Sequence, residues 1–237
     1  MLSIGKLASA EYYLASVAAG VEDYYTGAGE APGVWMGTGA GLLGLSGQVA
    51  AEDLRAVLGG QDPAGAPLVS GKAAAKGRLP GFDLTMSAPK SVTLLFALGD
   101  EAVADATRAA HDEAVAEALG YLEAEAAQLR RGHDGLAVEA AGGLVAAGFR
   151  HRTSRAGDPQ LHTHVLVANL APSAEGRWSA LDGRAVYAHA RTAGFLYQAA
   201  LRAALTQRLG VRWGPVRRGM AEVAGFTVIE TELVAVV

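Results

Sequence analysis

Two histidines separated by one residue are candidate metal ligands. His162 and His164 lie in the apolar run from Leu161 to Leu170, which has the length and the valine and leucine content of a strand. Because side chains repeat every two residues along a strand, both imidazoles point to the same face. His151 lies upstream near the end of another apolar run, and a hairpin between the runs brings it opposite the pair. Three neutral imidazoles suit a divalent ion such as zinc, nickel, copper, cobalt or manganese, with positions left open for a substrate oxygen.

The tyrosines cluster near the start of the chain, where Tyr12-Tyr13 and Tyr24-Tyr25 supply four of the seven. A phenol has a pKa of about 10, so at neutral pH it attacks only with help from a base or a metal-activated electrophile. Asp83 is the candidate base, because it lies in an apolar stretch where partial burial favours taking up a proton. Taken separately, these features are typical of packing or turn capping. Only their combination indicates catalysis.

The charges are distributed unevenly around a net charge of −4. Residues 101–125 hold seven acidic side chains and one arginine, whereas residues 150–218 hold eleven arginines and three acidic side chains. Such asymmetry allows a phosphate-binding face opposite an acidic one, although it also fits a surface that is simply uneven. Lys90, Arg152 and Arg155 are the candidate phosphate contacts, and each of them also fits a solvated surface charge.

Length and composition exclude several classes of protein. With 237 residues, 51% of them apolar, the chain can bury a sizeable core in one domain or two. The absence of cysteine excludes disulfides, thiolate metal sites and thiol nucleophiles. The N-terminus lacks the pattern of a signal peptide, which predicts a cytoplasmic protein. No stretch approaches the roughly 18 apolar residues that span a bilayer, so we expect no membrane protein.

Two glycine-containing stretches resemble nucleotide-binding motifs without meeting their structural requirements. Residues 39–44 match the dinucleotide pattern GxGxxG, but the preceding apolar run 34–36 is too short for a buried strand and residues 45–47 break any following helix. Residues 71–72 resemble a phosphate loop, yet Ala73 replaces the required serine or threonine. The sequence therefore excludes an ATPase.

The elements that must position the candidate residues follow from hydrophobic periodicity and from turn residues. Extended chain is expected at 82–84, with a turn at 87–90 before the apolar stretch 92–98. Strands at 144–149 and 161–170 form an antiparallel hairpin about the turn 154–159. Loops and turns anchored by Trp35 are expected between 27 and 47. Helices are predicted over residues 51–58, 100–130 and 184–209.

Several of these motifs together resemble one family. Residues 149–155, FRHRTSR, followed by residues 158–164, DPQLHTH, are similar to the three-histidine motif of TrwC/TraI-type conjugative relaxases, the MobF group of the HUH endonucleases. Residues 83–91 resemble the second motif of that family, and the paired tyrosines resemble its nucleophile motif. Residues 35–47 also fit the pattern. The resemblance covers about residues 1–220.

The resemblance implies an α+β fold in which a central antiparallel sheet, the palm of a hand, is flanked by helices and carries a divalent metal ion such as Mg, Mn or Zn. The implied activity is nicking of one DNA strand at an origin of transfer, followed by strand transfer. In the implied roles, Tyr12 attacks the scissile phosphate and leaves a covalent phosphotyrosine and a 3′ hydroxyl. Asp83 takes the tyrosine's proton, and Tyr24 or Tyr25 serves a second transfer. The implied metal ligands are His151, His162 and His164.

Two departures from the family pattern affect these expectations. The tyrosine pairs are further apart than is usual in the family, so the role of the second pair is open. Relatives continue into further helices that close over the DNA and then into a helicase domain, whereas this chain stops at Val237. We therefore expect a single relaxase domain over 1–237, truncated at its C-terminus, with single-stranded and origin-of-transfer DNA as its partners. A helicase domain or partner would lie outside this chain.

Three alternatives remain open at this stage. A three-histidine metallohydrolase would use a metal-bound water and would need no tyrosine. A noncatalytic remnant would bind DNA without cutting it. In a plain α+β domain, the histidines would be packed without metal.

Overall fold

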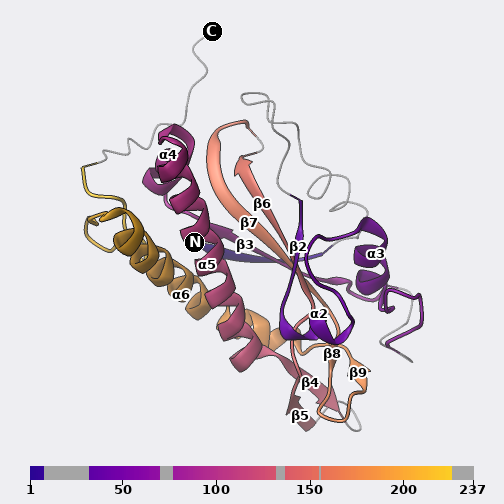
Figure 1. Cartoon of the computed structure of the whole chain (residues 1–237). Helices are drawn as coiled ribbons and strands as arrows, with labels where there is room; N and C mark the ends of the chain where they lie inside the picture. The colour runs from indigo at the N-terminus through magenta and orange to yellow at the C-terminus, as the bar shows by residue number, and fades with distance from the viewer. Residues whose placement is uncertain (8–31, 70–76, 132–136, 155, 226–237) are drawn as a thin grey trace.

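A five-stranded antiparallel sheet forms the centre of the molecule (Figure 1). The computed structural model describes residues 1–7, 32–69, 77–131, 137–154 and 156–225. The strand order is β1-β3-β7-β6-β2, and every neighbouring pair is antiparallel. The strands are β1 (Leu2–Lys6), β3 (Gly81–Ser87), β7 (Pro159–Ala168), β6 (Ala146–Thr153) and β2 (Val34–Met36). Two small hairpins complete the strands: β4 (Gln128–Arg131) with β5 (Ala137–Ala140), and β8 (Ala171–Pro172) with β9 (Trp178–Ser179).

Helices cover both faces of the sheet. One face packs against α5 (Glu101–Ala126) and α6 (Gly183–Leu209), which run side by side in Figure 1, and against the shorter α4 (Lys90–Leu98). The other face carries α3 (Ala51–Gly59) and the single-turn α2 (Thr38–Leu42). Alternation along the strands divides the core: Val165 and Val167 face α5 and α6, whereas Leu166 and Ala168 face the α3 side.

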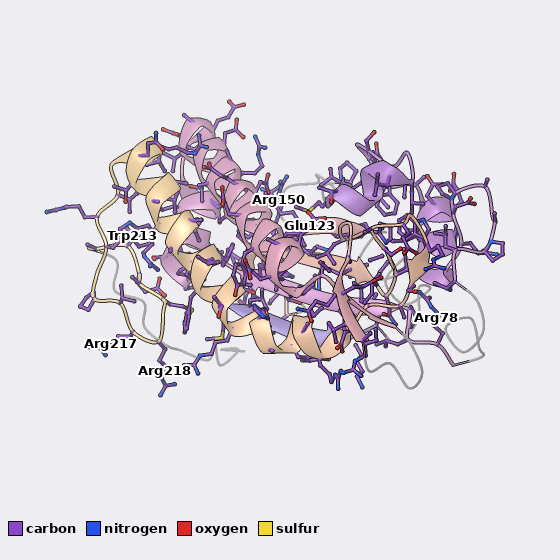
Figure 2. All side chains as sticks on the ribbon, turned by 90° about the horizontal axis from the view of Figure 1, so that it is seen from below. Arg78, Glu123, Arg150, Trp213, Arg217 and Arg218 are labelled. Atoms are coloured by element: carbon purple, nitrogen blue, oxygen red, sulfur yellow. The ribbon has the colours of Figure 1, made fainter. Side chains whose placement is uncertain are left out.

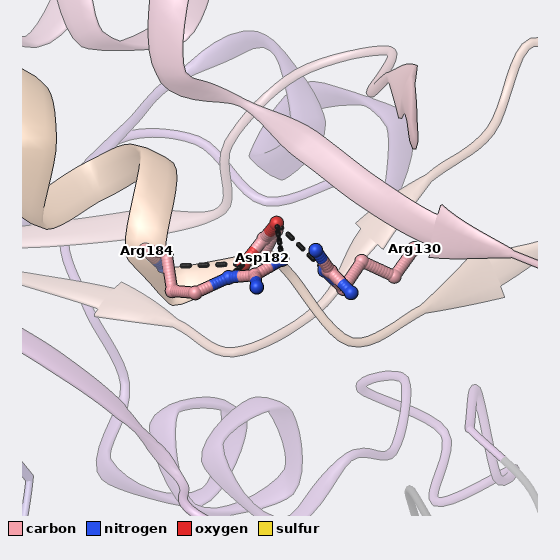
Figure 3. Close-up of polar contacts among 3 residues, drawn as sticks. All are labelled: Arg130, Asp182 and Arg184. Atoms are coloured by element: carbon pink, nitrogen blue, oxygen red, sulfur yellow. Dashed lines mark hydrogen bonds and ion pairs between the residues drawn. The ribbon is translucent and has the colours of Figure 1, made fainter. Parts of the chain in front are cut away.

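Side-chain caps determine where the two long helices begin. Asp100 precedes α5 and accepts a hydrogen bond from the Val103 backbone N–H at 2.9 Å. Asp182 precedes α6 and accepts a hydrogen bond from the Arg184 backbone N–H at 3.2 Å. Its carboxylate also pairs with the guanidinium groups of Arg184 and Arg130, each at 2.9 Å (Figure 3). Such N-caps satisfy backbone donors that a helix start leaves without partners. They hold both helices in place behind the sheet.

Glu123, labelled in Figure 2, joins α5 to the start of α2 and of β6. One of its carboxylate oxygens accepts hydrogen bonds from the Thr38 backbone, the Thr38 hydroxyl and the Leu144 backbone, each at 2.7 Å. A Cβ atom on Gly39 would lie 2.8 Å from the Leu144 carbonyl oxygen, so only glycine allows this approach. Gly39 therefore serves chain packing and Gly44 supplies a positive φ, while β2, an antiparallel edge strand, gives no dinucleotide-binding geometry.

Most predicted elements are present, with two corrections. The hairpin, the helix from residue 51 and the helix up to Leu209 are confirmed. The helix predicted over 100–130 ends at Ala126, and Gln128–Arg131 forms β4 instead. The prediction of loops throughout 27–47 is wrong for the described part, because β2 and α2 lie there. The stretch 92–98, left unassigned, is helical. In the described ranges, no helix has the length and apolarity needed to cross a bilayer.

Candidate metal centre

The β6–β7 hairpin brings the three predicted histidines together. His151 and His162 are directly opposed in register, and His164 follows two residues later on the same face. The ring centroids are separated by 5.2 Å between His151 and His162, by 5.3 Å between His151 and His164, and by 5.1 Å between His162 and His164. The cluster lies on the face opposite α5 and α6, because Val165 and Val167 of the same strand point to those helices.

Polar groups hold two of these rings by their Nδ1 atoms. His164 Nδ1 lies 2.9 Å and 3.0 Å from the two carboxylate oxygens of Asp83 on β3, and the Thr85 hydroxyl donates to the same carboxylate at 3.3 Å. His162 Nδ1 donates to the Gln160 carbonyl oxygen at 2.8 Å. A hydrogen bond at Nδ1 leaves Nε2 as the atom available to a metal ion, which is the usual support of metal-binding histidines.

The spacing of the rings fits a metal ion held by three imidazoles. With metal–nitrogen bonds of about 2.1 Å and near-tetrahedral angles, ring centroids lie about 5 Å apart. Within the residues that the structure describes, no group of three or more His, Cys, Asp or Glu side chains is already arranged to hold an ion. The match to an ion therefore lies in the spacing of the ring centroids and not in an arranged set of nitrogen atoms. The donor set, three imidazoles with one supporting carboxylate, is that of a borderline divalent ion.

A buried polar network lies directly behind this cluster. His111 on α5 is fully buried, and its Nε2 lies 2.8 Å from the hydroxyl of Thr163, the residue between the two β7 histidines. Its Nδ1 lies 2.8 Å from the hydroxyl of Tyr197 on α6, which is also fully buried. The network therefore fixes the back of the strand segment that carries His162 and His164.

Burial also keeps these imidazoles neutral. Desolvation, followed by the positive charges of Arg150, His162 and the N-terminal amine, lowers the pKa of His111 to about 3. Desolvation likewise lowers the pKa of His162, partly offset by its hydrogen bond to Gln160. A neutral imidazole is the form that binds a metal ion, so His162 is ready to coordinate at neutral pH.

Two of the predicted DNA contacts, Lys90 and Arg152, lie at the same end of the sheet as the histidines but not both on the histidine face. Lys90 begins α4, and its Nζ donates to the Pro159 carbonyl oxygen at 2.8 Å. The Arg152 guanidinium lies 5.3 Å from the ring centroid of Phe96 on α4, across the sheet from the three histidines. Arg155 and the four predicted nucleophiles, Tyr12, Tyr13, Tyr24 and Tyr25, lie outside the described residues.

Sequence reasoning did not identify His111, Thr163, Tyr197 or Thr85. His111 does carry a signal, because it lies at helical spacing among the buried small residues of α5. A histidine in an otherwise apolar stripe needs a polar partner. Its partners are 52 and 86 residues away, however, and nothing in the sequence identifies them.

The comparison with protein families decides the classification. The model of the TrwC relaxase family matches residues 7–233. The chain belongs to the TrwC relaxase family. The copper-bound structure of the conjugative relaxase TrwC with oriT DNA is 36% identical, with a TM-score of 0.80, and the match covers 96% of this chain and 77% of that one. The metal-free structure of the TrwC complex is 37% identical, with a TM-score of 0.76 and coverage of 94% and 75%. These matches confirm the predicted α+β fold of the TrwC relaxase family.

Curated relatives in the TrwC relaxase family are much longer. The multifunctional conjugation protein TraI of Escherichia coli strain K12 is 37% identical over 206 residues, which is 82% of this chain and 11% of TraI. A second Escherichia coli TraI is 43% identical over 150 residues, which is 62% of this chain and 8% of that protein. The chain thus spans about a tenth of the TraI proteins that it matches.

Proposed function

We propose that this chain is a DNA relaxase that cuts one strand at an origin of transfer and holds the cut end as a phosphotyrosine. The observation that carries the proposal is the cluster of His151, His162 and His164, supported by Asp83, on the sheet of a TrwC-family chain. The solved relatives include complexes of TrwC with oriT DNA, two of them metal-bound. By that likeness, the substrate of this chain is single-stranded DNA containing such a site.

In the proposed reaction, the Tyr12 oxygen forms a bond to the scissile phosphorus while the bond from phosphorus to the 3′ oxygen breaks. The tyrosine loses its proton, and the departing oxygen gains one as a 3′ hydroxyl. His151, His162 and His164 would hold a divalent ion, which would supply stabilisation of the negative charge on the phosphate, so the step would need no nucleotide cofactor. Because the phosphodiester energy is kept in the phosphotyrosine, the 3′ hydroxyl of another strand can reverse the step.

Asp83 has two proposed roles that call for different geometry. Both of its oxygens lie within hydrogen-bonding distance of His164 Nδ1, which supports a role in orienting that ring toward an ion. The role of proton acceptor for Tyr12 stays a prediction, since it depends on a residue outside the described ranges. The roles of Tyr13, Tyr24 and Tyr25 stay predictions for the same reason. Lys90, Arg152 and Arg155 are proposed phosphate contacts.

The wider setting of the chain is also part of the proposal. We treat residues 1–237 as one relaxase domain that works in the cytoplasm, where plasmid or integrated DNA is found. A helicase domain or partner is proposed as a component outside residues 1–237.

The test is denaturing gel electrophoresis of the protein with labelled single-stranded DNA from the adjacent genomic region, with Mg²⁺, Mn²⁺ or Zn²⁺ supplied. We expect a slow-migrating covalent band that disappears in Tyr12→Phe and in His162→Ala. Tyr121→Phe, a change on α5 behind the sheet, is the matched control and keeps the band.

The same assay separates the alternatives. Cleavage without a covalent band, unchanged in Tyr12→Phe, would assign the activity to a metal-bound water. Binding without cleavage in every metal would make the chain a noncatalytic remnant. Persistence of the band in Tyr12→Phe together with its loss in Tyr13→Phe, Tyr24→Phe or Tyr25→Phe would move the nucleophile to that residue.

A further inference from the structure

The outer face of α6 carries a stripe of aromatic and basic residues that the proposed reaction does not use. Tyr187, Arg191 and Phe195 follow one another at intervals of four, so their side chains lie along one side of the helix. Tyr187 is 41% exposed and Phe195 is 42% exposed, which is unusual for large aromatic side chains. The Arg191 guanidinium lies 5.4 Å from the centroid of the Phe195 ring.

This stripe lines a groove of about 590 Å³. Its second wall is the start of β1, at Met1 and Leu2, and its third is the segment after α6, at Arg218 and Met220. The segment is held close to α6, because a Cβ atom on Gly219 would lie only 2.3 Å from the Phe195 ring. Figure 2 shows Arg217 and Arg218 extending away from the helices at this side of the molecule.

Two arginines, Arg191 and Arg218, line the groove, and the stretch of chain that forms two of its walls is basic. Residues 183–221 contain seven arginines and no acidic side chain. Arg184 and Arg208 are paired with carboxylates at the two ends of α6. Among the described residues, Arg191, Arg217 and Arg218 form no ion pair, so their charges are available to an anionic partner. An unpaired arginine between two exposed aromatic rings, with a second arginine on the facing wall, is a combination that can bind single-stranded nucleic acid through phosphates and stacked bases.

The groove begins at the same end of the sheet as the candidate metal centre, on the α6 face and not on the histidine face. The N-terminal amine of Met1 donates to the Ser87 carbonyl oxygen at 2.5 Å, and Ser87 is the register partner of His162. Met1 therefore lies at the end of the sheet that carries the histidines, about 10 Å away across two strand spacings. A single strand that leaves the candidate metal centre needs only to pass the β1 edge to enter the groove.

We propose that this groove binds the single-stranded DNA that extends from the cleavage site, with Arg191 and Arg218 on phosphates and Tyr187 stacked on a base. The inference rests on the proposed function, because that function supplies a single strand at the neighbouring site. It assigns the α6 face a task in holding the substrate, separate from the bond-breaking step.

The test compares binding of two oligonucleotides by fluorescence anisotropy. One contains only the origin-of-transfer site, and the other carries a dT extension of about 12 nucleotides, a length that such grooves can accommodate. Extensions on the 5′ and 3′ sides are measured separately. We expect an extension on one side to tighten binding, and Arg191→Glu combined with Arg218→Glu to remove that gain while leaving cleavage of the short oligonucleotide unchanged.

The size of the effect follows from counterion release. Loss of two phosphate contacts lowers the slope of log K against log salt by about 1.4. When the salt falls tenfold, from roughly 1 M to 0.1 M, the variant therefore gains about 25-fold less affinity than the wild-type chain. Tyr187→Leu keeps an apolar side chain beside Phe82 and removes stacking, so it lowers affinity for the extended oligonucleotide at least about fivefold. The matched control, Arg108→Glu combined with Arg177→Glu, changes the net charge equally at exposed arginines elsewhere and keeps the gain.

Three outcomes would overturn the inference: no gain from either extension, an equal loss in the control variant, or binding of polyglutamate in place of the extension, which would indicate an acidic protein partner. Binding is measured without cleavage, so a chain that cuts no oligonucleotide would contradict the proposed function while the effect of the extension could still be read. A 5-bromouracil crosslink in the extension that maps to the peptide containing Tyr187 would place the strand directly.

Discussion

His111 is expected to make the fold weaker in mild acid. Its pKa is about 3 in the native protein, where burial acts first and the charges of Arg150, His162 and the N-terminal amine add to it. In the unfolded chain the pKa returns to about 6.5. Between these values the unfolded state binds a proton that the native state does not, so stability is present above pH 6.5 and is lost as the pH falls. Linkage gives a loss of about 2 kcal/mol between pH 7 and pH 5.

The assay is urea unfolding at several pH values for the wild-type chain and for His111→Gln. Glutamine can donate to one neighbour and accept from another, so it replaces part of the network with Thr163 and Tyr197 but does not titrate. We expect the variant to be less stable at pH 7 and to lose about 2 kcal/mol less than the wild type on going to pH 5. His189→Gln, at a half-buried histidine bonded to Tyr121, is the control for the exchange of a histidine for glutamine elsewhere in the helices. An equal loss in His111→Gln and the wild type would refute the reasoning.

Three further predictions concern the supports of the site and of the fold. Asp83→Asn is expected to weaken Mn²⁺ or Zn²⁺ binding about 10- to 100-fold without unfolding the chain, because His164 loses its charged partner; isothermal titration measures this, and unchanged affinity would contradict it. Asp182→Ala removes the N-cap of α6, and this loss is expected to lower the free energy of urea unfolding by about 1–2 kcal/mol. The ion pair with Arg184 adds little, because the Arg184 side chain is exposed and returns to water, so the double variant with Arg184→Ala should cost little more. Glu123→Ala leaves two backbone donors without an acceptor and the Thr38 hydroxyl with only its 3.3 Å contact to the Gly142 carbonyl oxygen, so thermal unfolding should show a loss of about 2–3 kcal/mol, and Glu123→Gln should restore much of it.

The candidate metal centre could be predicted because it depends on local periodicity. His162 and His164 lie two residues apart in a strand, and the turn residues before Pro159 fold His151 back onto them. Both facts are visible within fourteen consecutive residues. The same holds for α6, where Asp182 and Gly210 mark the two ends of an amphipathic stretch.

The misses arise where distant parts of the chain decide the local structure. The alanine-rich pattern of α5 continues beyond Ala126, but Gln128–Arg131 pairs with Ala137–Ala140, and this pairing ends the helix. The glycines around Gly39 were interpreted as loop formers, whereas their lack of side chains lets α2 approach the Leu144 carbonyl. No pattern in the sequence connects His111 with Thr163.

Strand β7 serves two purposes with one run of residues, because His162 and His164 face the reaction side while Thr163 and Val165 face the helices. Adding or deleting a single residue ahead of His162 would exchange the two sets. The imidazoles would then point into the hydrophobic core, and aliphatic side chains would occupy the proposed metal site. Substitution can therefore alter this strand during evolution, but a change of length cannot. Engineering of a different metal preference should keep the spacing and vary only side-chain identity.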